Sequence, residues 1–214
     1  MGQLTGGPFY HLVGRTGNNV GRVLRGKNVF SMRPTKKDRP PSPAQLNQRL
    51  RFATITTWLG SGIIDFVDLG FQDYAADMSA FNAAVQYNLD HAVTGVAPNY
   101  LVDFPATRLS RGKLSMPGSM EVATGTAQSV EYVWGPTIGS LNALPEDLAV
   151  CIAYCHQMDI FVMSVGAVTR AAQEFVLDLP ADFAGTSVYC WLAFLSPDKK
   201  LVSNSIGIGE VPIT

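Results

Sequence analysis

The sequence predicts an α+β protein with an N-terminal basic β-hairpin arm, a short helical segment and a C-terminal β-sandwich of the immunoglobulin or fibronectin type III kind. Three observations predict this. Basic residues are concentrated near the start, apolar residues recur at helical spacing in the middle, and short β-favouring runs separated by turn residues fill the rest. We expect the three parts to span residues 1–41, 42–98 and 99–214.

The arm has the pattern of a β-hairpin. Residues 20–24 and 28–32 are β-favouring runs on either side of an Arg-Gly-Lys sequence, in which Gly26 can supply the turn. Residues 33–41 follow with three prolines and four basic residues, a composition typical of an extended linker.

Three helices are expected in the middle segment. Ser42, Pro43 and Gln45 form a capping box, so the first helix begins here. Shorter patterns predict helices over residues 63–71 and 79–93. The apolar residues of the first helix are Leu46, Leu50, Phe52, Ala53, Ile55 and Leu59.

The last part reads as a series of short strands. Residues 129–134 alternate apolar and polar side chains, as in a half-buried strand. Residues 148–154 and 187–195 are apolar on both faces, as expected of central strands in a sandwich. The full set of expected strands is 100–104, 107–110, 120–124, 129–134, 148–154, 160–165, 174–179, 187–195 and 200–208.

Charge is distributed unevenly along the chain. Residues 1–41 hold eight Lys or Arg against one acid, a net charge of +7, whereas residues 42–98 carry −3 and residues 99–214 carry −5. Such an arm either binds an anionic partner or remains a solvated tail. The candidate partner- or anion-binding residues are Arg15, Arg22, Arg25, Lys27, Arg33, Lys36, Lys37 and Arg39.

Motifs for catalysis are weak. Ser-x-x-Lys occurs at Ser110 and at Ser196, but neither copy is expected in a helix and no partner motif follows. Asp65 and Asp68 have helical spacing and are expected on a solvated face. We therefore predict no catalytic residue, no metal ligand and no cofactor. Cys151, Cys155 and Cys190 are expected to be buried thiols, and Trp58, Trp134 and Trp191 to pack in the core.

The chain lacks the sequence features of export or membrane insertion. Its first residues are polar and rich in glycine, and no apolar run approaches the roughly 18 residues of a membrane helix. We expect a cytoplasmic protein, or one that is part of an assembled particle, with no membrane partner and no small-molecule substrate.

Short segments with a specific order recur along nearly the whole chain: 17–21 (GNNVG), 25–27 (RGK), 33–34 (RP), 43–49 (PAQLNQR), 80–85 (AFNAAV), 179–185 (LPADFAG), 192–194 (LAF) and 202–205 (VSNS). Together they resemble an uncharacterised domain family common in Bacteroidota. The family has no assigned activity, so the resemblance implies a fold and marks no residue as catalytic.

These observations favour a non-enzymatic structural or assembly protein. Its basic arm would dock on a neighbouring subunit by strand addition and charge complementarity, giving a homo-oligomer, filament or virion-like shell. The alternative is a nucleic-acid-binding protein whose arm contacts phosphates. An enzyme is the third class, which a pocket with convergent polar residues would favour.

Overall fold

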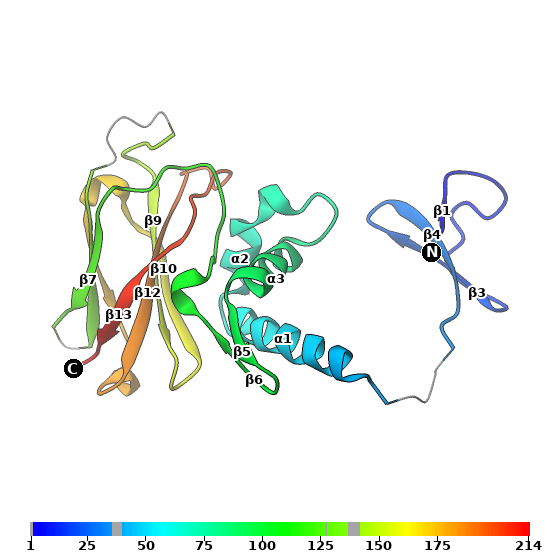
Figure 1. Cartoon of the computed structure of the whole chain (residues 1–214). Helices are drawn as coiled ribbons and strands as arrows, with labels where there is room; N and C mark the ends of the chain where they lie inside the picture. The colour runs from blue at the N-terminus through cyan, green and yellow to red at the C-terminus, as the bar shows by residue number, and fades with distance from the viewer. Residues whose placement is uncertain (1, 36–39, 127, 137–141) are drawn as a thin grey trace. The chain divides into compact units, whose positions relative to one another are not determined.

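The chain forms a mixed α+β structure (Figure 1). The computed structural model describes residues 2–35, 40–126, 128–136 and 142–214. Within these residues there are three α-helices and thirteen strands, and the strands form four antiparallel sheets. The chain divides into two compact units, Met1–Ser42 and Pro43–Thr214, here called the N-terminal unit and the helix–sheet unit.

The N-terminal unit is a small antiparallel sheet with strand order β1-β4-β3-β2. Arg25 and Gly26 have φ values of 51° and 74°. Two successive left-handed residues make the turn that matches the twist of a two-residue hairpin, so the predicted hairpin is confirmed. The strands are β1 (Gly2–Leu4), β2 (Gly14–Thr16), β3 (Asn19–Leu24) and β4 (Lys27–Met32).

The three predicted helices are confirmed, with shifted ends. The third starts one residue later than expected, because Ser79 is its N-cap and accepts a hydrogen bond from the Asn82 N–H. Asp68 pairs a further N–H of this first turn, that of Phe81. The helices are α1 (Pro43–Gly60), α2 (Ile64–Gly70) and α3 (Ala80–His91), and the short 3₁₀ turn η1 (Gln72–Tyr74) precedes α3.

The apolar face predicted for α1 is buried only in its second half. Ile55 and Leu59 are fully buried there, whereas Leu46 and Leu50 in the first half are exposed. The predicted helix is therefore confirmed, but the first half of its apolar face is exposed within the described part of the helix–sheet unit.

After α3 the chain forms a hairpin that the sequence placed only in part. Val93, expected at the end of α3, instead starts β5 (Val93–Val96), which pairs with β6 (Asn99–Val102). Strands β5 and β6 pack beside α1 rather than joining the larger sheets. A short 3₁₀ turn, η2 (Phe104–Ala106), follows.

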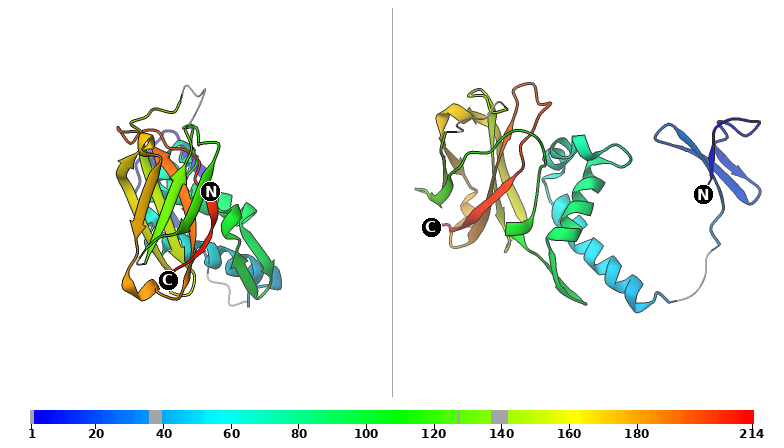
Figure 2. Two further views of the ribbon diagram at one scale, coloured as in Figure 1. Left: turned by 90° about the vertical axis from the view of Figure 1, so that its left-hand side faces the viewer. Right: turned by 45° about the horizontal axis from the view of Figure 1, so that its top comes forward.

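Two larger sheets face each other, and the helices cover the outer side of one of them (Figures 1 and 2). One has the order β10-β9-β12-β13 and the other β11-β8-β7. Their strands are β7 (Met120–Thr124), β8 (Ser129–Trp134), β9 (Leu148–Cys155), β10 (Ile160–Thr169), β11 (Glu174–Asp178), β12 (Ser187–Leu195) and β13 (Ile206–Pro212), with 3₁₀ turns η3 (Arg170–Ala172) and η4 (Ala181–Phe183).

The central strands are apolar on both faces because each face lies in a different core. In β9, Val150 and Ile152 pack with the helices, whereas Cys151 and Ala153 pack against the β11-β8-β7 sheet. Strand β12 alternates in the same way. This confirms the prediction that β9 and β12 are central strands.

One predicted strand is wrong, and another is displaced along the chain. Residues 107–110 are irregular, because the Asn88 side chain bonds both backbone groups of Arg108 and leaves no strand partner for them. The last strand runs Ile206–Pro212 rather than over residues 200–208. Ahead of it, the hydroxyls of Ser203 and Ser205 accept hydrogen bonds from backbone N–H groups of other segments.

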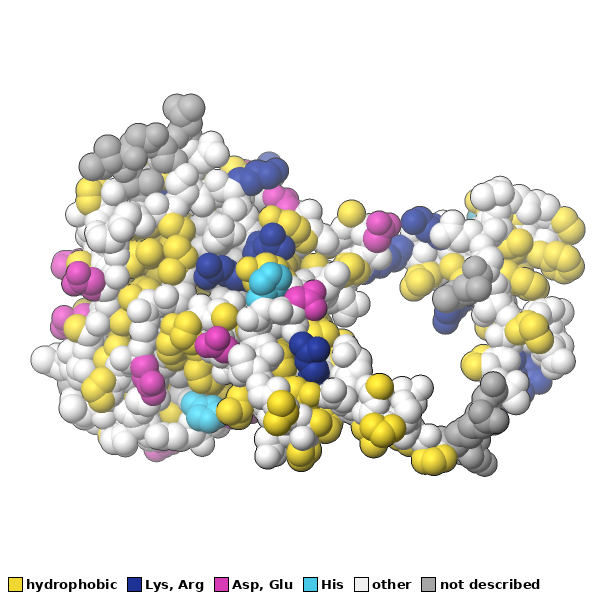
Figure 3. Space-filling model, in the orientation of Figure 1, with side chains coloured by type: hydrophobic (Ala, Val, Ile, Leu, Met, Phe, Trp, Pro, Cys, Tyr) yellow, Lys and Arg dark blue, Asp and Glu magenta, His cyan; other side chains and the backbone are white. Residues whose placement is uncertain are grey.

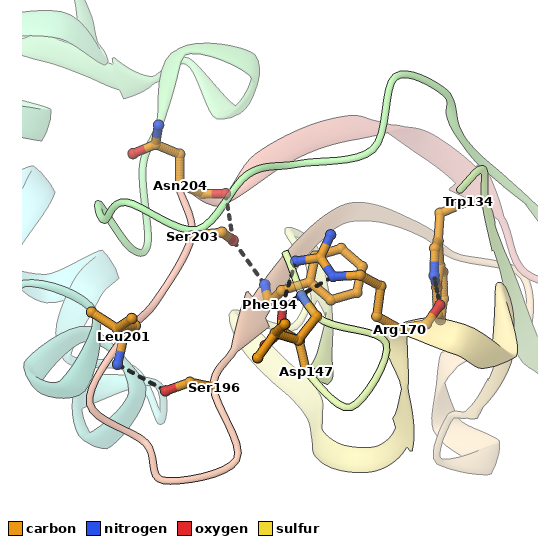
Figure 4. Close-up of polar contacts among 9 residues, drawn as sticks. Trp134, Asp147, Arg170, Phe194, Ser196, Leu201, Ser203 and Asn204 are labelled. Carbon is orange, nitrogen blue, oxygen red and sulfur yellow. Dashed lines mark hydrogen bonds and ion pairs between the residues drawn. The ribbon is translucent and has the colours of Figure 1, made fainter. Parts of the chain in front are cut away.

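A buried ion pair closes one end of the two facing sheets (Figure 4). Arg170 Nη2 lies 3.2 Å from Asp147 Oδ2, and the guanidinium lies 3.8 Å from the centre of the Phe194 ring. The Trp134 indole N–H donates a 2.9 Å hydrogen bond to the Arg170 carbonyl. Burial lowers the pKa of Arg170, which Asp147 partly offsets.

Candidate functional site

Strand register brings three of the eight predicted cations onto one face of the N-terminal sheet. Arg22 lies opposite Val29, and Lys27 lies opposite Leu24. Arg15 of β2 lies opposite Val20, which shares the face of Arg22 in β3. Directly opposed residues of antiparallel strands project to the same side. The basic face therefore comprises Arg15, Val20, Arg22, Leu24 and Lys27, together with the buried Val29.

The chain's own loop covers the centre of the opposite face of this sheet, whereas Val23 and Met32 on that face stay exposed. The Phe9 ring stacks on Phe30 with centroids 6.2 Å apart. Gly21 allows the Leu12 backbone to approach closely, since a Cβ there would lie 2.4 Å from the Leu12 carbonyl oxygen. On the basic face Arg15, Arg22, Leu24 and Lys27 are exposed, whereas Val29 at its centre is buried.

The N-terminal unit has almost no hydrophobic core. Among its described residues, Val29 is the only hydrophobic side chain that is buried. A unit of about 40 residues has too small a core to be stable alone and usually needs a disulfide, a metal or a partner surface. Its exposed large hydrophobic residues are Phe9, Tyr10, Val13, Val23, Leu24 and Met32.

The remaining predicted cations are not part of the basic face as the register defines it. Arg25 is an exposed residue of the β3–β4 turn, and Arg33 is exposed just after β4. The Arg33 N–H donates to the Asn18 carbonyl at 2.7 Å, which continues the hairpin by one pair. Lys36, Lys37 and Arg39 lie outside the described residues.

The helix–sheet unit contains a pocket of about 650 Å³ with aromatic walls. It opens between α1, β6 and the end of β9. The Trp58 ring lies 5.9 Å from both Phe104 and Tyr154, centre to centre. Such a pocket can hold a flat apolar group. Its lining comes from three distant stretches of sequence: residues 53–58, 100–104 and 154–159.

Two polar groups belong to residues that line this pocket, the Tyr154 hydroxyl and the Trp58 indole N–H. The Tyr154 hydroxyl donates a 2.7 Å hydrogen bond to Asp159. Burial raises the pKa of Tyr154, and the Asp159 carboxylate raises it further. The Trp58 N–H is buried and makes no hydrogen bond to the other described residues.

Sequence reasoning missed the pocket because Trp58 was expected only to pack in the core. Trp58 is indeed buried, as are Trp134 and Trp191. No local spacing links α1 to the β9–β10 turn, so the sequence carries no signal for their meeting. Only the pairing of β9 with β12 and the packing of α1 on them bring the two together.

A family model matches residues 11–209 of the chain, and its description is a family of unknown function, DUF6266. The chain belongs to DUF6266. This confirms the resemblance to an uncharacterised family. The match begins in the N-terminal unit and reaches into β13, so the DUF6266 pattern includes most of both units. No curated protein matches the chain.

Within this DUF6266 chain the cysteines are buried, as expected. Cys151, Cys155 and Cys190 are free thiols. Burial raises the pKa of Cys190 to about 12 and also raises that of Cys151. Such thiols stay protonated at neutral pH and are poor nucleophiles.

The weaker motifs of the DUF6266 chain have structural roles. The Ser110 hydroxyl donates to the Ser203 carbonyl at 2.9 Å, and the Ser196 hydroxyl bonds Asp198 within a turn. In the described part of the chain no group of three or more His, Cys, Asp or Glu is placed to hold a metal ion. Nor is any helix there long and apolar enough to cross a bilayer.

Proposed function

We propose that this protein is a structural or assembly protein that acts by binding rather than by catalysis. Its N-terminal unit docks on a neighbouring copy and builds a homo-oligomer, filament or virion-like particle in the cytoplasm. The observation that carries the proposal is the folded N-terminal sheet with a single buried hydrophobic side chain, Val29, among its described residues. A unit of this size is stabilised when another surface covers it.

Charge supports a copy of the same chain as the partner. The first 41 residues carry a net charge of +7, and the remainder of the chain carries −8. Oppositely charged surfaces accelerate encounter and favour one orientation.

We further propose that the two facing sheets of the helix–sheet unit are an immunoglobulin-like sandwich, a scaffold that presents broad sheet faces.

The sheet face, rather than its edge, supplies the contact area in this proposal. The edge strands β1 and β2 have three residues each, so strand addition would form few main-chain hydrogen bonds. The basic face adds apolar contact through Leu24, which is 53% exposed. Charge and apolar burial together give a specific interface.

Sedimentation velocity tests the proposal. The full chain is compared at low ionic strength with a chain that starts at Ser42, which retains the helix–sheet unit. We expect concentration-dependent association of the full chain and a monomer for the shortened one. If both remain monomers at high concentration, the assembly proposal is wrong.

The second candidate function is nucleic-acid binding. The observation that favours it is the placing of Arg15, Arg22 and Lys27 on one face from three strands. Such a face can contact successive phosphates without reading sequence. Fluorescence anisotropy with single- and double-stranded DNA at two salt concentrations tests it. Steep loss of binding with salt supports this function, and no binding at low salt rejects it.

A further inference from the structure

The outward face of the β11-β8-β7 sheet is acidic. Val133 of β8 lies opposite Glu121 of β7 on one side and Glu174 of β11 on the other. Two residues earlier, Glu131 lies opposite Val176. All five side chains are exposed. Successive side chains of β8 project to opposite sides of the sheet. Because Tyr132 and Trp134 point into the core between the sheets, Glu131 and Val133 point outward.

One further carboxylate lies on this outward face, and the three strands that form the face contain no Lys or Arg. Asp178, opposite Ser129 at the end of β11, is also exposed. Strands β7, β8 and β11 contain four acidic residues and no Lys or Arg. Acidic side chains are visible along the left-hand edge of Figure 3, where β7 lies. The acidic face comprises Glu121, Glu131, Val133, Glu174, Val176 and Asp178.

The acidic face also carries exposed apolar surface. Val133 and Val176 are each 50% exposed, although both lie in regular strands. A hollow of about 390 Å³ on this sheet includes Glu131, Val133, Glu174 and Val176 in its lining. An apolar centre flanked by charges is the usual composition of a docking surface.

The basic face of the N-terminal unit has the complementary composition. It places three cations around Val20 and Leu24, as the acidic face places four carboxylates around Val133 and Val176. Each face is formed by three antiparallel strands. Two sheets of this kind pack face to face about 10 Å apart, with side chains of both filling the space.

We propose that the acidic face of one copy receives the basic face of a second copy. This rests on the proposed function and names the receiving surface for it. The two faces are different, so the contact is heterologous: each copy offers one of each. A heterologous contact propagates from copy to copy and ends in a ring or a filament, not in a symmetric dimer.

Neutral variants of the full chain test this contact. Arg22→Gln with Lys27→Gln removes charge from the basic face only, and Glu131→Gln with Glu174→Gln removes it from the acidic face only. We expect each variant to self-associate about tenfold more weakly than the wild type at low salt, since each loses two charge pairs of the interface. Sedimentation velocity gives the association constants.

Mixing the two variants separates this contact from any other. The Glu131→Gln/Glu174→Gln variant keeps an intact basic face, and the Arg22→Gln/Lys27→Gln variant keeps an intact acidic face. An equimolar mixture should therefore form one-to-one complexes that do not grow, because the two remaining faces are both impaired. If the mixture associates no better than either variant alone, the proposed contact is wrong.

A matched control removes the same charge elsewhere. Asp90→Asn with Asp182→Asn neutralises two exposed carboxylates outside the acidic face and should associate as the wild type does. If the wild type is monomeric, the assembly proposal itself fails. If the wild type associates and only the arm variant weakens it, with Glu131→Gln/Glu174→Gln unchanged, the arm docks elsewhere and the acidic face is not the receiving surface.

Discussion

Asn88 pairs both backbone groups of Arg108, twenty residues further along the chain. Asn88 Oδ1 accepts a 2.8 Å hydrogen bond from the Arg108 N–H, and Asn88 Nδ2 donates one of 2.8 Å to the Arg108 carbonyl. The buried Asn88 amide thus pairs the backbone N–H and C=O of Arg108, as the backbone of a neighbouring strand would. It attaches α3 to the segment that leads from the hairpin to the sheets.

Replacing Asn88 by alanine should therefore destabilise the helix–sheet unit by about 2–4 kcal/mol, because two part-buried backbone groups of Arg108 lose their partner. Urea denaturation followed by tryptophan fluorescence measures this, since Trp58, Trp134 and Trp191 all lie in this unit. Asn82→Ala, at an exposed position on α3, is the control and should change little. Equal effects of the two variants would contradict the role given to Asn88.

Removing Asp147 should leave the buried Arg170 charge without its carboxylate partner. Arg170 and Asp147 have side chains 5% and 1% exposed. We expect Asp147→Ala to cost about 3 kcal/mol, or roughly 6–12 °C in melting temperature for a unit of this size. Calorimetry measures the shift. Asp73→Ala breaks only an exposed 3.7 Å pair with Lys113 and should leave the melting temperature nearly unchanged.

Tyr154 should make stability fall at high pH. The pKa of the Tyr154 hydroxyl is about 10 in the unfolded chain and is raised above this value in the folded state. Below about pH 10 the hydroxyl is neutral in both states, and its full contribution to stability is present. This contribution is lost as the pH rises above about 10 towards the folded pKa. In Tyr154→Phe the unfolding free energy should decline less steeply between about pH 10 and 11. Tyr74→Phe, at an exposed site, should follow the wild type; a Tyr154→Phe slope equal to that of the wild type would count against this view.

Gly21→Ala should loosen the N-terminal unit alone. The new Cβ would meet the Leu12 carbonyl oxygen at 2.4 Å. Overpacking of this kind costs about 1–3 kcal/mol, so amide protection in β3 and β4 should fall about tenfold in hydrogen exchange. Gly6→Ala, which meets no atom within 4 Å, is the control. Lost protection in β9 or β12 would show that the effect is not confined to this unit.

Local patterns were sufficient for the elements whose partners lie close in sequence. The β3–β4 hairpin follows from Arg25-Gly26 between two β-favouring runs, and α3 follows from the helical spacing of its apolar residues. The alternation in residues 129–134 also predicted correctly which side of β8 is buried, as Tyr132 and Trp134 show. In each case the information lies within about ten residues.

The misplaced elements have partners far away in sequence. Residues 107–110 look like a strand, but a side chain from α3 bonds their backbone. Leu46 and Leu50 look like core positions, but both side chains are exposed within the described part of the helix–sheet unit. The spacing of apolar residues predicts which face of an element can be buried. It does not predict whether another element packs against that face.

By itself the sequence determined that the chain has a basic start, an amphipathic middle and a β-rich end, and that its charges are separated. Only the tertiary structure decided which charges share a surface. Arg15, Arg22 and Lys27 form one face, and Glu121, Glu131 and Glu174 another, because of the register of their strands. Register depends on which strands pair and at which residue, and a shift of one residue would turn every side chain to the other side.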